Sequence, residues 1–327
     1  MNNMAKVTIN DVARVSGYGV GTVSRAIRGD KSVKASTRAK ILKVIEELHY
    51  SPNVNGARLR QKHSNVIAVL VPIINHPVFA ELVEHIETKA NEQGYSVLLV
   101  SSQNNIEREH DILRMIKQKE VDGAIFVTHY EHDEEEIKGC PLVSIDRHLN
   151  HVVPFVSSDN YQATRNAIEM FISHGDKKIG FIGTKPFVKS EVSLREEAYL
   201  DVMKEHGLEV RAVSEIVEHG EEVRLVDQFL EKYPDLDAIF ASGNTLSQLT
   251  YQKLKELGKK VPEEVELIGY DGVFSSWDNT VTISSIQQPI QLMAASAFEI
   301  LVKLIDGQEV EQANIFNTKF IKGNTTR

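Results

Sequence analysis

Three short segments near the start of the chain place apolar residues on one helical face, and each ends at a glycine or a polar stretch. The first follows Thr8, which with Asp11 is typical of a helix start, and Gly17 ends it. The inward positions that the spacing predicts are Ile9, Val12, Ala13 and Ser16, then Val20, Val23 and Ile27, then Ile41, Leu42, Ile45 and Leu48. Two short helices joined by a glycine-containing turn form the skeleton of a helix-turn-helix.

A polar segment with few apolar residues follows this N-terminal head (residues 1–50). It runs over residues 51–64 and begins Ser51-Pro52-Asn53. Its composition predicts a segment that cannot fold alone, either a linker or a segment that becomes ordered only on binding.

The pattern changes after residue 64, where a continuous apolar run, Val66–Val71, predicts a strand buried on both faces. Strand and helix patterns then alternate in two successive series. The first series runs over 66–71, 78–93, 97–100, 107–118, 124–127, 142–145 and 155–157. The second runs over 161–173, 179–182, 195–206, 223–232, 238–241, 246–257 and 265–270. This alternation predicts parallel sheets in doubly wound α/β layers.

Two series predict two similar lobes with a ligand cleft at the carboxyl ends of the strands. The fold class expected is therefore α/β, with an all-α helix-turn-helix head and a two-lobed, doubly wound body. We expect one lobe to comprise residues 65–160 and about 289–317, and the other 161–288 and about 318–327.

Charge divides the chain in the same way as the hydrophobic pattern. Residues 1–64 hold twelve Lys and Arg against four Asp and Glu, a net charge of +8, whereas the whole chain of 327 residues carries −9. A basic head on an acidic body is expected where only the head meets a polyanion.

Composition excludes several other classes of protein. The hydrophobic fraction of 42% is that of a globular protein, and no apolar run reaches the roughly 18 residues of a membrane helix. The single cysteine, Cys140, excludes an intrachain disulfide. Without a signal-peptide pattern at the N-terminus, a cytoplasmic location is expected, with no membrane partner.

Several motifs, in order along nearly the whole chain, resemble those of LacI/GalR-family transcription regulators. The head motifs are VTINDVARVSG at 7–17, GTVSR at 21–25 and EELHYSPN at 46–53. The body motifs include PVFAE at 77–81, SIDR at 144–147, SDN at 158–160, DAIFA at 237–241, IGYD at 268–271 and SIQQP at 285–289. The head motifs are highly specific, whereas each body motif alone is weak.

The resemblance implies a homodimer whose paired heads bind a pseudo-palindromic operator in double-stranded DNA. It implies a body like the periplasmic sugar-binding proteins, with a small effector, a sugar or sugar phosphate, in the cleft. Some members of the family use a phosphorylated carrier protein as corepressor, so a corepressor-dependent global carbon regulator is an alternative. The main expectation is a repressor of carbohydrate-utilisation genes.

In a helix-turn-helix the start of the second helix lies at base edges in the major groove. The residues placed nearest the bases are Val20, Gly21, Thr22, Ser24 and Arg25. Phosphate contacts are implied by the resemblance for Thr8, Ser32, Lys34 and Thr37, and hinge contacts for Asn53 and Leu59, the latter as a minor-groove wedge. The alternatives are that Val20 and Thr22 only pack, and that Leu59 is an exposed linker residue.

Two glycines depart from the family pattern, which usually has serine near Gly19 and a larger residue near Gly21. Each glycine costs a helix about 0.8–1 kcal/mol relative to alanine. Because Gly21 has no side chain to read a base, specificity is expected to depend on Arg25, the hinge and DNA shape.

The resemblance also implies a set of effector ligands in the cleft: Phe79, Asp146, Arg195, Asn244, Asp271 and Gln288. Charged and polar groups would bind sugar hydroxyls, and an aromatic ring would cover an apolar sugar face. The alternatives are a surface salt bridge of Arg195 with Glu191 or Glu196, and a turn-forming Asp271 before Gly272. His76, Gln288 and Trp277 are weaker candidates, for which packing is an equal alternative.

No catalytic, metal or cofactor motif stands out in the sequence. There is no Walker A motif, no G-x-S-x-G elbow and no H-E-x-x-H pattern. The stretch with His129, His132 and residues 133–136 is expected to be a solvated helix face rather than a metal site. The competing hypotheses are a sugar receptor module without a DNA role, against which the basic head argues, and a doubly wound enzyme.

Overall fold

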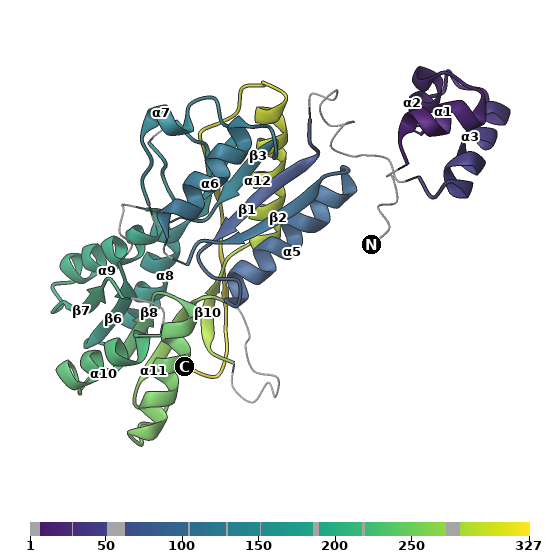
Figure 1. Cartoon of the computed structure of the whole chain (residues 1–327). Coiled ribbons are helices and arrows are strands. Elements are labelled where there is room, and N and C mark those ends of the chain that lie inside the picture. Colours follow the sequence, from purple (N-terminus) through teal and green to yellow (C-terminus); the bar gives the residue numbers. More distant parts are fainter. Residues whose placement is uncertain are drawn as a thin grey trace. The chain divides into compact units, whose positions relative to one another are not determined.

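The computed structural model describes residues 7–327 except 28, 51–62, 104, 129, 151, 186–189, 218–219 and 273–281. The chain divides into two compact units, residues 1–64 and 65–327. Figure 1 shows the first unit as three helices and the second as two α/β lobes.

Three helices form the head: α1 (Ile9–Ser16), α2 (Val20–Ile27) and α3 (Ala35–Glu47). Thr8 and Asp11 form a reciprocal capping box at the start of α1, and Gly17 ends it with a left-handed φ of 74°. Val12, Val23 and Ile41, one from each helix, are fully buried against one another in a small apolar core. The three-helix prediction is thus confirmed.

Two residues predicted to face inward are exposed instead. Val20 is 37% exposed and Leu42 is 46% exposed. Leu42 lies about 100° around the helix from the fully buried Ile41, so Val44, three residues after Ile41, takes the inward position. Val20 begins α2, before the turn of the helix that packs on the core.

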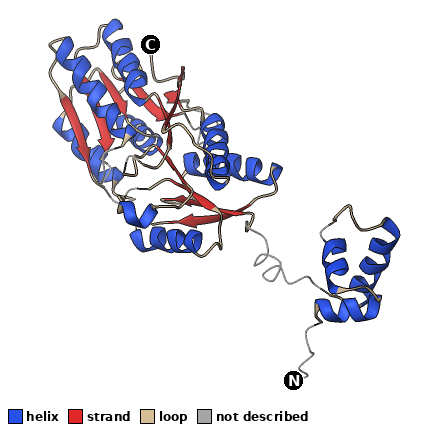
Figure 2. Ribbon diagram, turned by 90° about the horizontal axis from the view of Figure 1, so that it is seen from above, coloured by secondary structure: helices blue, strands red, loops and turns tan. Residues whose placement is uncertain are grey.

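The first lobe contains a six-stranded sheet of order β11-β5-β4-β3-β1-β2, parallel throughout. Its elements are β1 (Val66–Val71), α5 (Pro77–Glu92), β2 (Ser96–Ser101), α6 (Ile106–Lys117), β3 (Gly123–Phe126), α7 (Glu134–Ile137), β4 (Leu142–Ile145), β5 (Phe155–Ser158), α12 (Ile290–Ile305) and β11 (Ala313–Phe316). Helices α5 and α12 pack on one face of the sheet and α6 on the other. Figure 2 shows blue helices on both sides of the red strands.

The second lobe repeats this arrangement, with a sheet of order β12-β10-β9-β8-β6-β7 in which β12 alone pairs antiparallel. Its elements are α8 (Asn160–Ser173), β6 (Ile179–Thr184), a 3₁₀ turn (Glu191–Ser193), α9 (Leu194–Glu205), β7 (Arg211–Glu215), α10 (Glu222–Lys232), β8 (Ala238–Ala241), α11 (Asn244–Glu256), β9 (Glu266–Asp271), β10 (Ser284–Gln287) and β12 (Lys319–Ile321). Helices α8 and α9 cover one face, α10 and α11 the other.

The chain crosses between the sheets three times, after β5, after β10 and after β11. The crossings are hydrogen-bonded to one another. The Asp159 amide donates to the Phe316 carbonyl at 3.0 Å, and the Thr318 amide donates to the Asp159 carboxylate at 2.7 Å. The Ser158 hydroxyl donates to the Gln288 side-chain oxygen at 2.9 Å. Side-chain and backbone bonds thus fasten the three connections together.

The doubly wound architecture predicted from the alternation is confirmed, but the pattern did not single out several late elements. These are β7, β10, α12, β11 and β12. Strand β7 is an edge strand of mixed exposure, and β11 and β12 are three to four residues long with exposed positions, so their hydrophobic pattern is weak. Figure 1 shows α12, from late in the sequence, among elements of the first lobe.

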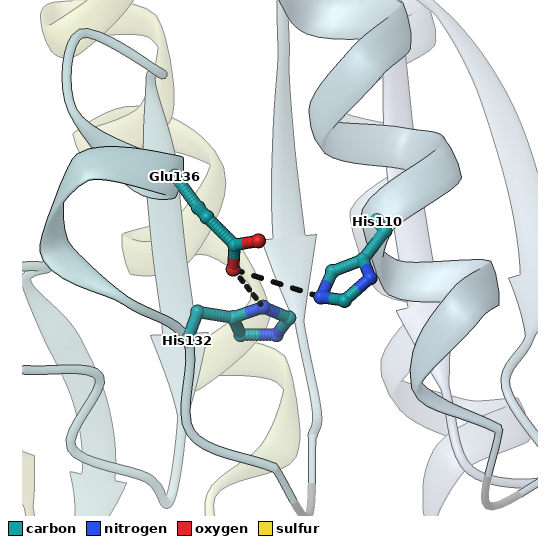
Figure 3. Close-up of side chains that lie close together, drawn as sticks. All are labelled: His110, His132 and Glu136. Atoms are coloured by element: carbon teal, nitrogen blue, oxygen red, sulfur yellow. Dashed lines mark ion pairs between the residues drawn. The ribbon is translucent and has the colours of Figure 1, made fainter.

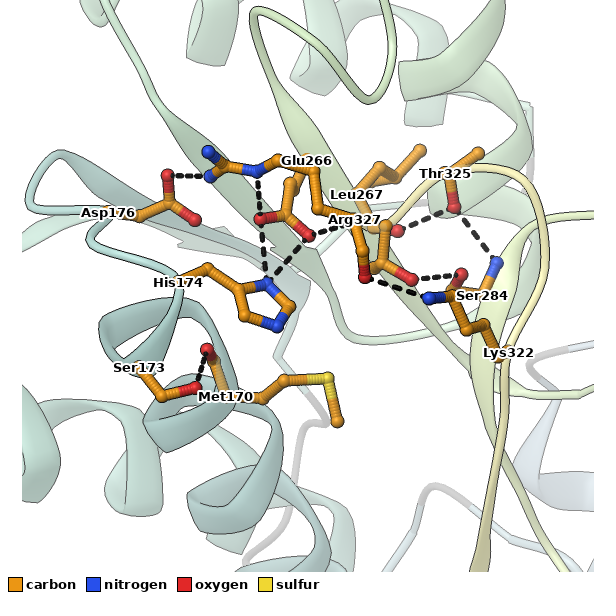
Figure 4. A network of polar contacts seen from close by, with 11 residues as sticks. Met170, Ser173, His174, Asp176, Glu266, Leu267, Ser284, Lys322, Thr325 and Arg327 are labelled. Atoms are coloured by element: carbon orange, nitrogen blue, oxygen red, sulfur yellow. Dashed lines mark hydrogen bonds and ion pairs between the residues drawn. The ribbon is translucent and has the colours of Figure 1, made fainter.

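The last residues of the chain are fixed to the second lobe by a polar network (Figure 4). The Arg327 guanidinium is paired with Glu266 at 2.7 Å and with Asp176, and Glu266 also contacts His174 at 2.9 Å. Both carboxylates are buried, at 0% and 5% exposure, and burial raises the pKa of Asp176 to about 6. The guanidinium therefore neutralises carboxylates that would otherwise be costly to bury.

Among the helices that the structure describes, none combines the length and the apolar character needed to cross a membrane.

The two glycines that flank the turn of the head are expected to respond in opposite ways to alanine. A Cβ at Gly21 or at Gly17 meets no atom within 4 Å, but Gly17 has a left-handed φ of 74°. Gly21→Ala should stabilise α2 by about 0.8–1 kcal/mol, slowing amide exchange across residues 20–27 by roughly four- to fivefold. Gly17→Ala should destabilise the head by about 1–2 kcal/mol. Hydrogen-exchange mass spectrometry on the full chain measures both, and faster exchange in Gly21→Ala would contradict this account.

Replacing Arg327 tests the carboxylate pair at the C-terminus. Because the Arg327 side chain is 44% exposed, we expect Arg327→Gln to lower the free energy of unfolding near neutral pH by only about 1–3 kcal/mol. Arg327 opposes the effect of burial on the Asp176 pKa, so its loss raises that pKa further above the unfolded value.

A carboxyl whose pKa is raised on folding takes up a proton when the chain folds, so stability rises as the pH falls through the folded-state pKa. The deficit of Arg327→Gln should therefore shrink between about pH 7.5 and about pH 5 in urea titrations. A deficit that is constant or grows on acidification would contradict the role assigned to Arg327.

Candidate functional site

The start of α2 presents a small, exposed surface that includes the Arg25 cation. Val20, Gly21 and Arg25 are exposed, whereas Thr22 and Ser24 are half-buried. The Arg25 guanidinium Nε donates to the Gly21 carbonyl at 3.3 Å, which lays the side chain along its own helix. The alternative that Val20 only packs against other residues does not fit, because Val20 is exposed and lies outside the apolar core of the head.

The residues expected to meet phosphates gather at helix starts. Lys34 is the N-cap residue of α3, is exposed and makes no side-chain capping bond, so it leaves the first amides of the helix open to an anion. Ser32 is exposed just before it, and Thr37 is half-buried in the first turn. Thr8 caps α1. The hinge candidates Asn53 and Leu59 lie outside the described residues.

A cavity of about 260 Å³ lies between the two lobes, and all six predicted effector residues line it. They are Phe79, Asp146, Arg195, Asn244, Asp271 and Gln288. The first two come from the first lobe, Arg195, Asn244 and Asp271 from the second, and Gln288 from the crossing after β10. The structure therefore brings together residues up to 209 positions apart in one cavity.

The two aspartates hold equivalent places in the two lobes. Asp146 directly follows β4 and Asp271 ends β9, and each strand is third from one edge of its sheet. Both have left-handed backbones, with φ of 57° and 85°. Such conformations are uncommon outside glycine and concentrate at functional sites, although Asp tolerates them better than most residues.

A chain of buried hydrogen bonds links Asp146 to the second lobe. The Ser157 hydroxyl donates to the Asp146 carboxylate at 2.6 Å, and the Asn160 side-chain amide donates to that hydroxyl oxygen at 3.1 Å. The Arg195 Nε donates to the Asn160 side-chain Oδ1 at 2.6 Å. This network holds the carboxylate and the guanidinium in fixed positions at the cavity.

A second network fixes Asp271. The Gln288 side-chain amide donates to its Oδ1 at 2.7 Å, and the Asn244 backbone amide donates to its Oδ2 at 3.2 Å. Because Gln288 also accepts from Ser158, the carboxylate is joined to the crossing between lobes. The alternative of a simple turn residue does not account for these contacts.

Arg195 is 4% exposed and its guanidinium carbon lies 3.4 Å from the centroid of the Tyr270 ring. Its Nη1 donates to the Ser242 carbonyl at 2.6 Å. The alternative of a surface salt bridge with Glu191 or Glu196 is therefore wrong, because the side chain turns into the protein rather than along the exposed face of its helix.

Burial shapes the electrostatics of the cavity. Burial raises the pKa of Asp146, although Arg195 and the Ser157 hydroxyl oppose the shift. Burial also lowers the pKa of Arg147 to about 10 and raises the pKa of Tyr270 to about 12. Charged groups so poorly hydrated form strong hydrogen bonds to a ligand that replaces the missing water.

Several residues that line the cavity were not predicted as ligands. Arg147, on the first-lobe side, is 6% exposed and donates to the Thr128 carbonyl at 2.9 Å. Lys185, Glu222 and Ser242 line the cavity from the second lobe. Only Arg147 carried a signal, since it follows Asp146 in the SIDR motif. Of the weaker candidates, His76 lines the cavity and contacts the Phe79 ring at 4.8 Å, while Trp277 lies outside the described residues.

The acidic, histidine-containing stretch was predicted to be a solvated helix face, and this is wrong for His132. Its side chain is 0% exposed and lies 2.6 Å from the equally buried Glu109. The neighbouring Glu134 and Glu135 are exposed as predicted, and His129 lies outside the described residues. The cause is Glu109 on α6, which draws the imidazole inward from a position distant in sequence.

Comparison with known proteins agrees with this geometry. Residues 8–53 match the model of bacterial regulatory proteins of the lacI family. Residues 64–324 match that of periplasmic binding proteins and the sugar-binding domain of the LacI family. The chain is 30% identical to the ribose operon repressor of Halalkalibacterium halodurans over 323 residues, covering 98% of this chain and 97% of the relative.

Two further similarities extend the comparison. Catabolite control protein A of Priestia megaterium is 30% identical, covering 94% of this chain and 95% of that protein. The lac repressor dimer bound to operator and the anti-inducer ONPF superimposes with a TM-score of 0.85 at 21% identity, covering 98% of this chain and 99% of that one, which shows a shared fold.

A helix-turn-helix joined to a two-lobed binding body defines a ligand-responsive, DNA-binding transcription regulator. The chain belongs to the LacI family of these regulators, and the resemblance seen in its motifs is confirmed.

Proposed function

We propose that this protein represses carbohydrate-utilisation genes by binding a pseudo-palindromic operator as a homodimer, under the control of a sugar held between its lobes. The observation that carries the proposal is the combination, in one chain, of an open recognition-helix start in a basic head with an interlobe cavity lined by buried charges. The role is regulatory rather than enzymatic, and it is exercised in the cytoplasm, where the DNA is.

Two kinds of DNA contact follow from the head. Val20 and Arg25 face base edges, where Arg25 makes a bidentate contact to guanine and Val20 meets a thymine methyl. Lys34, Ser32 and the open amides at the start of α3 hold a phosphate, and Thr8 and Thr37 hold others. Asn53 and Leu59 add hinge contacts, with Leu59 inserted in the minor groove.

The chemistry of the cavity favours a carbohydrate. Asp146 and Asp271 accept hydrogen bonds, Arg195 and Asn244 donate them, and the Phe79 ring offers an apolar wall. Alternating hydroxyl and C–H surfaces of a sugar match this mixture. The cavity of about 260 Å³ has room for a ligand the size of a monosaccharide. Similarity to a ribose operon repressor supports the same class.

Control by a carrier-protein corepressor is the second candidate, favoured by the similarity to catabolite control protein A. In that case, the cavity would bind sugars weakly, and a phosphorylated carrier protein would raise operator affinity.

Arg25→Ala tests base reading. We expect it to weaken binding to an operator selected from genomic fragments by about 1–3 kcal/mol, roughly 5- to 150-fold, and to relax specificity. Lys34→Ala should weaken binding to all DNA sequences alike. It should also reduce by about one the slope of the logarithm of the binding constant against the logarithm of the salt concentration. Lys43→Ala is the matched control for Lys34→Ala, because Lys43 is an exposed lysine of α3 that pairs with Glu47. Fluorescence anisotropy measures each, and unchanged affinity in Arg25→Ala refutes its assignment.

Ligand binding is tested by melting the protein with a panel of sugars and sugar phosphates. A ligand that binds the folded body raises the melting temperature by mass action, by several degrees at about a hundredfold excess over its Kd. Asp271→Asn and Asp146→Asn should each weaken that ligand by roughly 10- to 150-fold, because each removes a charged acceptor. Asp306→Asn, at an exposed helix end, should behave as wild type. A ligand bound equally by all three variants does not occupy this cavity.

A further inference from the structure

A second cluster of chemistry-bearing side chains lies in the first lobe. His110 on α6, His132 before α7 and Glu136 on α7 point toward one another (Figure 3). The Glu136 carboxylate is 3.6 Å from the His110 Nε2 and 3.8 Å from the His132 Nδ1, and the three ligand atoms all lie within 4.8 Å of one another. None of them lines the sugar cavity.

His132 provides the observation that points to a ligand. Its side chain is 0% exposed, and its Nδ1 finds no hydrogen-bond partner among the described residues. A buried polar atom without a partner is costly, so it requires an explanation. The atom faces Glu136 and His110 (Figure 3), whose side chains are 42% and 31% exposed, so solvent reaches two of the three residues.

The opposite nitrogen of His132 is held as it would be in a metal-bound histidine. Its Nε2 lies 2.6 Å from the fully buried Glu109 carboxylate, to which the Thr128 hydroxyl also donates at 2.6 Å and 2.7 Å. A carboxylate that accepts a hydrogen bond from one ring N–H fixes the tautomer in which the other nitrogen has a free lone pair, and such outer carboxylates orient metal-bound histidines. The second nitrogen of His110 lies 3.9 Å from the exposed Glu107 carboxylate, which is beyond hydrogen-bond distance.

We propose that His110, His132 and Glu136 bind one divalent transition-metal ion of the zinc class. Imidazole and carboxylate are ligands that Zn²⁺ accepts, and bonds of about 2.0–2.2 Å place tetrahedral ligand atoms about 3.3–3.6 Å apart, close to the 3.6 Å and 3.8 Å between Glu136 and the two histidines. Three protein ligands leave a fourth position, on the exposed side of Glu136, for water. The positive charge of the ion, bound to the His132 ring, compensates the buried Glu109 carboxylate on the other side of that ring.

The simplest rival is a structural ion pair in which a protonated His132 bridges Glu109 and Glu136. The two differ in a measurable way, because an ion pair takes up no metal. The test uses the full chain, freed of metal by a chelator and then exchanged into chelator-free buffer, with ZnCl₂ and CoCl₂ as probes. Co²⁺ reports on its own ligands through visible absorption.

Wild-type protein should bind one Zn²⁺ per chain in calorimetry, show a saturable Co²⁺ band that Zn²⁺ abolishes, and melt at a higher temperature with Zn²⁺. His110→Gln and Glu136→Gln should each weaken binding at least about tenfold. Since both positions are partly exposed, each variant without metal should melt near the wild-type temperature. His206→Gln, from an exposed His–Glu pair with Glu169 in the other lobe, is the matched control and should bind as wild type.

Two results overturn the proposal. One is the absence of saturable one-to-one binding by wild-type protein. The other is binding by His110→Gln and Glu136→Gln at wild-type affinity, which would place the ion elsewhere. The outcome is independent of whether the interlobe cavity binds a sugar, since no residue of the cluster belongs to it.

Discussion

Charged side chains buried between the lobes must be compensated, and this constraint organises the body. Arg147, Arg195 and Asp271 are nearly inaccessible and Asp146 is half-buried, and each would be destabilising if left without a partner. The protein compensates them with fixed hydrogen bonds from both lobes, through Ser157 and Asn160 on one side and Gln288 on the other. The cost of burying these groups falls further when a polyhydroxyl ligand fills the cavity.

The same pairing of charged groups recurs away from the cavity. Arg327 neutralises Asp176 and Glu266, and His132 faces Glu109. In the first pair the compensating cation belongs to the chain, whereas around His132 one nitrogen stays unbonded among the described residues. Asp176 also keeps one buried oxygen, Oδ2, without a hydrogen-bond partner among the described residues, so the two networks differ in the cation that Arg327 supplies and not in the completeness of their hydrogen bonds.

Motifs predicted much of this structure, because they encode local chemistry. The capping residues of α1, the breaks at Gly17 and Gly29, and the alternation of strands and helices all follow from short-range spacing. The six cavity residues came from a family resemblance rather than from spacing. Spacing did not indicate that Asp146 and Asp271 adopt left-handed backbones, since other residues share that sequence context.

The sequence did not predict which side chains are buried by residues that lie far away along the chain. His132 lies in a stretch of charged residues that reads as solvated, yet Glu109 and Thr128 enclose it from positions that only the fold brings near. Arg195 likewise lies on a helix with charged neighbours but turns inward onto Tyr270. Leu42 shows the reverse, an apolar residue left in water because its neighbour Ile41 already fills the core of the head.

The three bonded crossings also decide how movement can leave the body. Sliding of one lobe past the other would break the bonds that Asp159 and Gln288 make at the connections, so a rotation about that line is the soft motion. The chain enters the body at β1, in the first lobe, directly from the hinge. Because the chain joins the head to the first lobe only, a rotation of the second lobe can act on the head only through the first lobe.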